Sequence, residues 1–552
     1  MTDFVAHIRG RLSAERQMVF VQDNGEPIRL TFTELDRRAR AVAVWLTGLG
    51  VTDQPALLLY PAGLDFTVAF LGCLYARVPA IPAPLPDAGA PHMRRVRALL
   101  RDAGAGLVLT DAAHASGLSD LGARVVVPSA DPGAWAPPAL GGDTVAYLQY
   151  TSGSTSEPRG VEVSHGNLLH NLGLFRALAA GKPPRRLAGW LPHYHDMGLV
   201  GLQLQALHTG ADLVFMSPNA FVARPVRWLE LISRYGADWT VSPDFGYSWC
   251  TRRVTDEQLA GLDLSTLAMA LSGAEPIKAA TLAGFERRFA PAGFRPTTWN
   301  PGYGLAECTL MVSCVPRGQD VTVRGFDPSA LERHEAIPDP AGVPLVACGP
   351  AAGLDLRIVD PDGCVPVPDG GIGEIWVAGP SVALGYRGRP EETRATFRAG
   401  GGRWLRTGDL GFLLDGQLYV TGRIKDVIVV NGRNLYPQDL EEAASRANPV
   451  AGRSAAFGVR RSDGGEHVVL VQEVRRGGSA YLGETAEQVM DLVSREFAVP
   501  LSLLLVARGV VRQTTSGKLR RRHMRDLFLG GSLTPLHAEV DPALHDLLET
   551  VP

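Results

Sequence analysis

The sequence contains very little lysine. Of its 54 basic residues only four are lysines, at positions 182, 278, 425 and 518. The abundance of alanine and glycine points to coding bias in a GC-rich genome as the cause. An ammonium and a guanidinium are not equivalent, so a lysine kept against this background marks a position where arginine does not serve. Lys425 and Lys518 lie in motifs described below, whereas Lys182 and Lys278 lie in segments expected at the surface.

The sequence also lacks the features of several protein classes. The net charge is -3, without the basic excess that accompanies nucleic-acid binding, so no nucleic-acid partner is expected. The six cysteines have neither metal-ligand nor paired spacing, and the start Met1–Phe4 has no signal-peptide character, which favours a reducing cytoplasm. No apolar run is long enough to span a bilayer, so no integral membrane segment is expected and any membrane contact would be peripheral.

Strands and helices alternate along much of the chain. Ile28–Phe32 predicts a strand and Thr33 the N-cap of a helix with an apolar face, closed near Gly50. Ala56–Tyr60 predicts a buried strand, and the rhythm recurs as far as Phe294–Trp299, whereas Pro79–Pro91 is expected to be an irregular connector. This alternation predicts an α/β protein with layered, mostly parallel sheets.

At 552 residues the chain exceeds the size of one hydrophobic core, so at least two domains are expected. The boundary is placed near Arg423–Asp426, where strand and turn chemistry gives way to a new pattern. We therefore expect a large N-terminal domain over residues 1–423 and a small α+β domain over residues 424–530. Residues 531–552 are expected to form a C-terminal appendage.

One loop combines the features of a phosphate site. Val145–Tyr150 predicts a strand and Ser164 opens a helix, and the segment between them, Gln149–Gly160, is rich in hydroxyl side chains and glycine. Gly153 allows backbone amides to turn inward as an anion nest. The segment is not a Walker motif. The alternative interpretation is a flexible surface loop.

Four further motifs follow in a defined order. They are Ser272–Pro276, Asn300–Glu307, Arg406–Asp409 continuing into Thr421–Asp426, and Thr515–Lys518. With the hydroxyl-rich loop, this set resembles the adenylate-forming superfamily of acyl-CoA synthetases, peptide-synthetase adenylation domains and luciferases. The resemblance extends from about residue 15 to residue 525.

Three segments narrow the resemblance to the fatty acyl-AMP ligase family: Gly189–Leu199, Tyr303–Glu307 and Asn431–Glu441. The resemblance implies that ATP and Mg²⁺ are the cofactors, with Thr151 and Glu307 as the metal ligands. It places Tyr303 on the adenine, Asp409 on the ribose and Arg423 on ribose or phosphate. The residues implied to bind ATP or AMP are Thr151, Ser152, Gly153, Ser154, Thr155, Arg159, Gly160, Gly273, Ala274, Glu275, Asn300, Tyr303, Gly304, Asp409 and Arg423.

The two lysines in motifs receive different roles from the resemblance. Lys518 matches the lysine that bridges the substrate carboxylate and the α-phosphate and stabilises the charge of the transition state. Lys425 matches the hinge about which the small domain rotates. Arg159 stands where the superfamily usually has lysine. The arginine keeps the positive charge at this position.

The resemblance also locates the acyl pocket, from a lip at His195 to a wall at Asp238–Trp249. Its implied residues are His195, Asp196, Met197, Trp239, Val241, Ser242, Asp244, Phe245 and Trp249. Val241, Ser242 and Trp249 are larger than or different from the residues that the family more commonly shows there. We therefore expect a medium-chain or functionalised acid.

A segment at Arg317–Leu345 resembles the insertion that marks acyl-AMP ligases and is thought to hinder the movement that CoA use requires. The expected function is ATP-dependent conversion of a fatty or related acid to acyl-AMP, followed by transfer to the phosphopantetheine thiol of an acyl carrier protein in polyketide, peptide or lipid biosynthesis. An acyl-CoA ligase and a catalytically silent adenylate-binding protein are the alternatives. Arginines at 520, 521, 522 and 525 could meet an acidic carrier, but an ordinary solvated patch is the favoured interpretation.

Overall fold

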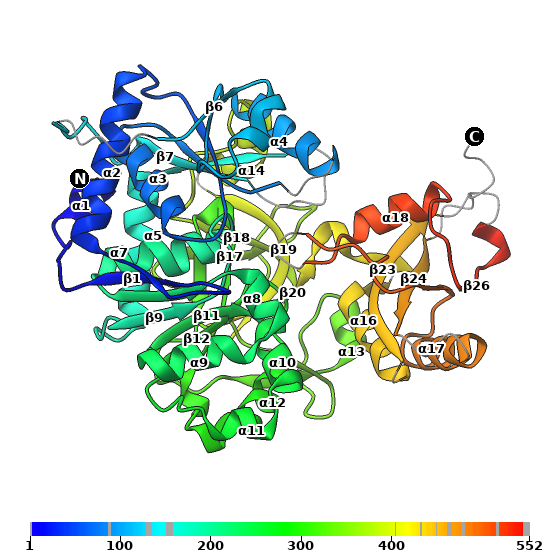
Figure 1. The fold of residues 1–552 in the computed structure, drawn as a ribbon. Helices are drawn as coiled ribbons and strands as arrows, with labels where there is room; N and C mark the ends of the chain where they lie inside the picture. The colour runs from blue at the N-terminus through cyan, green and yellow to red at the C-terminus, as the bar shows by residue number, and fades with distance from the viewer. Residues whose placement is uncertain are drawn as a thin grey trace.

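The computed structural model describes residues 3–86, 90–128, 134–150, 158–402, 404–430, 433–448, 450–460, 466–475, 481–514 and 518–544 (Figure 1). A large N-terminal part, blue to yellow in Figure 1, stands beside a smaller C-terminal part in orange and red. Among the described residues, no helix combines the length and the apolarity that crossing a membrane requires.

The first sheet of the N-terminal part has the order β6-β5-β3-β4-β7-β8 and is parallel except for its last pair. Helices α2 and α3 pack against each other beside it. The bounds are α2 (Phe32–Gly48), β3 (Ala56–Tyr60), α3 (Leu64–Tyr75), β4 (Ala80–Pro84), α4 (Ala90–Ala103), β5 (Leu107–Leu109), β6 (Arg124–Val126), β7 (Val145–Tyr150) and β8 (Gly160–Ser164).

The second sheet has the order β14-β13-β12-β11-β9-β10-β1-β2 and is parallel except at its two ends. Its strands are β1 (Gln17–Val21), β2 (Ile28–Thr31), β9 (Arg186–Gly189), β10 (Asp212–Met216), β11 (Trp239–Pro243), β12 (Met269–Gly273), β13 (Trp299–Gly304) and β14 (Met311–Cys314). Its helices are α1 (Phe4–Arg9), α5 (His165–Leu178), α6 (Asp196–Gly198), a π-helix (Leu199–Leu204), α7 (Gln205–Thr209), α8 (Pro218–Ala223), α9 (Val226–Tyr235), α10 (Asp244–Arg253), α11 (Asp256–Ala260) and α12 (Ala279–Phe289).

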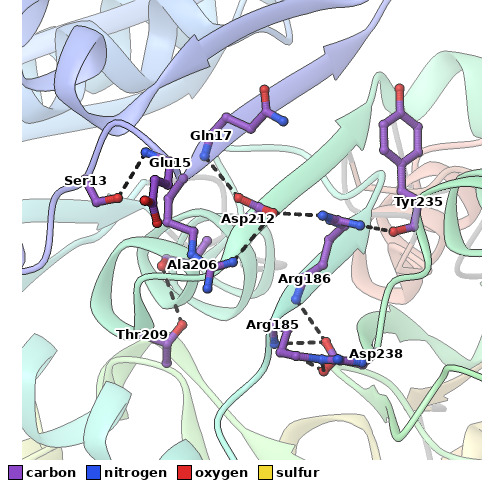
Figure 2. Close-up of polar contacts among 11 residues, drawn as sticks. Ser13, Glu15, Gln17, Arg185, Arg186, Ala206, Thr209, Asp212, Tyr235 and Asp238 are labelled. Carbon is purple, nitrogen blue, oxygen red and sulfur yellow. Dashed lines mark hydrogen bonds and ion pairs between the residues drawn. The ribbon is translucent and has the colours of Figure 1, made fainter.

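Polar contacts tie together the amino ends of the parallel strands of this sheet (Figure 2). Asp212 at the start of β10 accepts from the Gln17 backbone N–H at 3.1 Å and from Arg186 Nη2 at 3.0 Å. Asp238, just before β11, accepts from the backbone N–H groups of Arg185 and Arg186. These contacts align the strand starts, so the carboxyl ends of β9, β11 and β12 lie together at the other edge.

Antiparallel strands complete the N-terminal part. They are β15 (Val323–Phe326) with β16 (Val343–Val346), and a sheet of β17 (Asp355–Val359), β18 (Gly373–Ala378), β19 (Leu405–Leu414) and β20 (Gln417–Arg423). Short helices accompany them: α13 (Pro328–Glu332), α14 (Pro390–Phe397) and α15 (Ala399–Gly402). The expected insertion is thus the β15–β16 hairpin with α13 inside its loop.

The C-terminal part has hydrophobic cores of its own, one on each face of the sheet β23-β24-β25-β26. Its elements are β21 (Ile428–Val430), β22 (Arg433–Leu435), α16 (Pro437–Ala447), β23 (Ala451–Arg460), β24 (Glu466–Val474), α17 (Leu482–Phe497), β25 (Leu501–Val506), α18 (Arg521–Leu529) and β26 (His537–Glu539). A one-turn helix at Ile424–Asp426 joins it to β20. The separate hydrophobic cores agree with two domains, and the boundary near 423–426 stays a prediction.

The expectations for regular structure are confirmed in outline. The mostly parallel α/β architecture is present, and the face of α2 that contains Leu35 and Leu46 is fully buried. The N-cap of α2 is Thr31 rather than Thr33, because the Thr31 hydroxyl accepts from the Glu34 backbone N–H at 3.2 Å. The helix therefore begins two residues earlier than expected.

Three expectations are wrong. The segment from Pro79 is not an irregular connector, because β4 pairs with β3 along Ala80–Pro84 and with β7 only at Ala80, so the prolines need not donate to β7. Phe294–Trp299 is not a strand, since a short helix precedes Trp299 and β13 starts there. Of the expected appendage, the described part joins the small domain's sheet, since β26 at His537–Glu539 pairs with β25.

A buried ion pair anchors α18 to the small domain and generates a stability prediction. Arg521 donates from Nε and Nη2 to the two carboxylate oxygens of Glu441, both at 2.7 Å. Replacing Arg521 by Ala leaves the buried Glu441 carboxylate uncompensated, which we expect to lower the free energy of unfolding of the small domain by about 3–5 kcal/mol. Guanidinium denaturation measures this change.

The control is Arg525→Ala on the same helix, where the side chain is exposed. It should change the free energy of unfolding by no more than about 0.5 kcal/mol. Equal effects of the two substitutions would contradict a special role for the Arg521–Glu441 pair.

Candidate active site

A cavity of about 2560 Å³ opens between the N-terminal and C-terminal parts. The carboxyl ends of β11, β12 and β13 reach it, as expected for a site on a parallel sheet. Most of the residues predicted from the sequence line it: Arg159, His195, Asp196, Met197, Val241, Phe245, Trp249, Gly273, Ala274, Glu275, Tyr303, Gly304, Glu307, Asp409, Arg423, Lys425 and Lys518. The tertiary structure therefore gathers motifs that are more than 300 residues apart.

The first phosphate-loop residues, Thr151, Ser152, Gly153, Ser154 and Thr155, lie outside the described residues. Arg159 at the end of this loop is described, and its Nε lies 3.0 Å from Glu392 Oε2. Its guanidinium also lies 5.7 Å from the centroid of the Tyr386 ring.

Gly160 does not line the cavity, but β8 requires a glycine there. A Cβ at this position would lie 2.8 Å from Cζ of Tyr150, the ring across the strand pair. Packing against Tyr150 therefore explains the glycine at position 160, besides the predicted role in ATP binding.

An aspartate with two partners forms the centre of the predicted nucleoside site. The Tyr303 hydroxyl donates to Asp409 Oδ2 and Arg423 Nε donates to Asp409 Oδ1, each at 2.7 Å. Asp409 and Arg423 face each other directly in the β19–β20 pair. The Asp409 charge raises the pKa of Arg423 well above its usual range, and burial raises that of Tyr303, so both remain hydrogen-bond donors.

The wall near Tyr303 requires small residues. A Cβ on Gly273 would lie 2.9 Å from the carbonyl oxygen of Gly302. Ala274 has a φ of 65°, a left-handed conformation unusual for a residue other than glycine. Such strain persists only where surrounding structure imposes it, and it is common at binding sites.

Glu307, the predicted metal ligand, lies in the cavity wall. Its Oε1 accepts a 2.9 Å bond from the Tyr386 hydroxyl, whose pKa burial and the Glu307 charge raise above its usual range. The tyrosine therefore stays protonated and orients the carboxylate. A carboxylate held in this way suits Mg²⁺, which is commonly bound by one or two carboxylates together with substrate phosphates.

His195 and Asp196 form a pair at the lip of the predicted acyl pocket. His195 Nδ1 lies 2.8 Å from Asp196 Oδ1, and the Met197 backbone N–H donates to the same oxygen at 2.7 Å. Burial alone would raise the pKa of Asp196, but His195 and the positive charge of Lys518 outweigh it and lower that pKa. Lys518, far away in sequence, therefore lies close enough to act on this lip.

Glu275 connects the wall near Tyr303 to the predicted acyl pocket. Its Oε1 accepts a 2.7 Å bond from the backbone N–H of Phe245, at the start of α10. Burial raises the pKa of Glu275 to about 7, although the Phe245 bond and the charges of Lys518 and Lys278 oppose this rise. The side chain thus fixes the position of Phe245 in the pocket wall.

Besides Gly160, four predicted pocket or nucleotide residues among the described ones do not line the cavity. Trp239 is buried at the start of β11 against Phe175, and Ser242 faces the opposite side of this strand from Val241. Asp244 accepts from the Lys278 backbone N–H and the Thr281 hydroxyl, and thereby joins α10 to α12. The Asn300 amide donates to the Val315 carbonyl.

The wall contains aromatic residues that sequence reasoning missed. Trp190 was not predicted, yet it lines the cavity beside the predicted Phe245, with Phe221 stacked on Trp190 at a centroid distance of 3.8 Å. Trp249 donates from Nε1 to the Val222 carbonyl at 3.3 Å, which fixes the indole at the wall. Trp190 is the second residue of the family segment Gly189–Leu199, and its place in that segment was the available signal.

The chain matches the family model described as "AMP-binding enzyme" over residues 10–387. It is 40% identical, over 96% of its length and 95% of the relative, to the medium-chain fatty acid–acyl-carrier-protein ligase JamA of Moorena producens. The fold is thus that of an AMP-binding enzyme.

Solved structures agree with this class. The fatty acid AMP ligase from Legionella pneumophila superposes with a TM-score of 0.76 at 33% identity, covering 97% of each chain. The fatty acyl-adenylate ligase from L. pneumophila in complex with acyl adenylate and pyrophosphate has the same TM-score at 32% identity, again over 97% of each chain. The chain belongs to the fatty acyl-AMP ligase family.

The bond between Tyr303 and Asp409 generates a prediction for nucleotide binding. Tyr303→Phe keeps the ring and removes one charge-assisted hydrogen bond, so we expect the KM for ATP to rise by about tenfold. Tyr303→Ala also removes the ring and should raise KM further. ATP–pyrophosphate exchange kinetics measure both, and a normal KM in Tyr303→Ala would contradict an adenine-binding role.

Proposed function

We propose that the protein converts a medium-chain or functionalised carboxylic acid and ATP to acyl-AMP and pyrophosphate, and then transfers the acyl group to an acyl carrier protein. The observation that supports this most is the convergence of Lys518 with Asp409, Arg423, Tyr303 and Glu307 on one cavity. Adenylate formation needs cations beside two anionic substrates and a slot for the nucleoside.

The nucleotide is held by residues on several strands. Asp409 accepts the ribose hydroxyls, Tyr303 contacts the adenine, and Arg159 and Arg423 contact phosphate or ribose. Glu307, together with Thr151, would hold Mg²⁺. When bound, this ion would supply screening of the negative charge of the ATP phosphates.

Lys518 stabilises the reacting groups by charge. Its ammonium lies where its field reaches Asp196 and Glu275, at the junction of the nucleoside site and the acyl pocket. There it bridges the carboxylate and the α-phosphate and stabilises the charge that develops between them. Lys518 belongs to the small domain, so adenylation requires that domain in the present orientation.

The acid is of medium length in this proposal. Trp249 and Val241 take up volume at the pocket wall, and the ligase JamA, whose printed name specifies medium-chain acids, is 40% identical. A smaller pocket excludes long chains by steric clash.

The acceptor is a carrier-protein thiol rather than CoA. The insertion is joined to the small domain, because Arg433 donates to both carboxylate oxygens of Glu332 at 2.7 Å and the Asn434 amide donates to the Glu332 carbonyl at 2.9 Å. Phe326 of the insertion packs in the same cluster as Tyr436. These contacts oppose the domain rotation that acyl-CoA formation requires.

The carrier partner and the cytoplasmic location remain predictions. Arg521 does not belong to a basic docking surface, because its guanidinium is paired with the Glu441 carboxylate. The exposed arginines that remain there are Arg520, Arg522 and Arg525.

An assay of acyl-AMP by mass spectrometry tests the proposal. The enzyme receives ATP, Mg²⁺ and acids of increasing chain length, with CoA, with phosphopantetheinylated carrier protein, or with neither. We expect acyl-AMP that discharges onto the carrier alone. Efficient acyl-CoA formation would instead identify an acyl-CoA ligase, and no adenylate from any acid would indicate a silent binding protein.

Replacing Lys518 by Ala should reduce adenylate formation by at least about 100-fold, since a charged group that acts in the transition state is lost. Lys182→Ala is the matched control, because Lys182 is an exposed lysine away from the cavity. Its activity should equal that of the wild type. Full activity in Lys518→Ala would overturn the role assigned to Lys518.

Replacing Trp249 by Leu tests the chain-length proposal. The smaller side chain enlarges the pocket, so the acid with the highest kcat/KM should become longer by a few carbons, because each buried methylene contributes about 0.8 kcal/mol. A panel of saturated acids measures the shift. An optimum at long acids already in the wild type would contradict a medium-chain specificity.

A further inference from the structure

Lys278 was expected at an ordinary surface, but it reaches across the boundary between the two parts of the molecule. It is the N-cap of α12 in the large domain, and its Nζ lies 2.6 Å from Oε2 of Glu442 on α16 in the small domain. Both side chains are about half exposed. An exposed ion pair contributes little to folding stability, so stability alone does not explain this contact.

The surroundings of Lys278 are rich in carboxyl groups from both sides. Glu275 and Asp244 belong to the large domain, whereas Asp439, Glu441 and Glu442 belong to α16 of the small domain. The positive charge of Lys278 acts on Glu275, Asp439 and Glu441, and the Glu442 charge reaches Asp244. Carboxylates of two domains thus face each other with Lys278 between them.

The other cationic side chains in this region interact with carboxylates other than Glu442. Arg521 is bound to Glu441 and lies 3.6 Å from Asp426, and Lys518 acts on Glu275 from the cavity side. Within the described part of the chain, Glu442 forms its ion pair with Lys278 and with neither of these two cations. Without Lys278, the remaining carboxylates would repel each other across the domain boundary.

We propose that Lys278 is a positioning residue for adenylation, which holds the small domain against the large one through Glu442 and so keeps Lys518 in the cavity. This role rests on the proposed function, because it explains the domain orientation that places Lys518 in the cavity. An equilibrium between domain orientations responds to small energy differences, so a single exposed ion pair is sufficient to bias it.

Separate measurement of adenylation and of acyl transfer distinguishes this role from a general structural one. Lys278→Gln should lower the rate of ATP–pyrophosphate exchange by about fivefold, the upper range for an exposed pair. Transfer of the acyl group from preformed acyl-AMP to the carrier should stay within about twofold of the wild type, because this step does not need Lys518 in the cavity. Lys182→Gln is the matched control and should leave both rates unchanged.

Exchanging the charges of Lys278 and Glu442 should rescue adenylation. Glu442→Lys alone should lower exchange as Lys278→Gln does, and the double variant Lys278→Glu with Glu442→Lys should restore most of it, because a cation again lies between the domains. Loss of both half-reactions together in Lys278→Gln, an unchanged exchange rate, or no recovery in the double variant would each overturn the proposal.

The pH dependence follows from the same groups. Burial raises the pKa of Asp439 and of Glu275 to about 7, so both are mainly neutral at pH 6 and mainly charged at pH 8. The defect of Lys278→Gln should therefore be larger at pH 8 than at pH 6, and the opposite order would contradict the electrostatic explanation. A wild-type enzyme without any exchange would instead refute the proposed function itself.

Discussion

The carboxylate of Asp409 joins three parts of the molecule. It accepts from Tyr303 at the carboxyl end of a strand in the large sheet, and from Arg423 at the last position before the connection to the small domain. A buried carboxylate with two donors is stable only while both remain in place. The proposed nucleoside site, the sheet β17-β18-β19-β20 and the start of the connection to the small domain are therefore held in one arrangement.

Charged groups around the cavity join the two domains, beside the apolar cluster that contains Phe326 and Tyr436. Glu332 with Arg433 and Lys278 with Glu442 are ion pairs between segments on opposite sides of the connection at Ile424–Asp426, and Lys518 reaches the cavity from the small domain. Each domain has its own apolar core. Ion pairs at such a boundary fix the relative orientation of the domains more than they add to folding stability.

The fold class was predictable, because it depends on local patterns. Strand and helix alternation identified the α/β architecture, and motifs of glycine, hydroxyl and charged residues singled out Tyr303, Asp409 and Lys518, which line one cavity in the structure. Proline content misled the prediction at Ala80–Pro84, since a strand can include proline where one neighbour is absent. Asp244 and Asn300 were assigned to the site from their motifs, yet their hydrogen bonds hold the scaffold.

The sequence by itself determined the family, the chemistry of the motifs and the presence of a separate small domain, because these follow from residue type, order and spacing. Only the tertiary structure decided which of those residues face one cavity, since strand direction and burial set the side that each side chain occupies. It also decided the partners of Lys278, Arg521 and Glu332. Contacts across a domain boundary depend on the relative position of two bodies, which no local pattern contains.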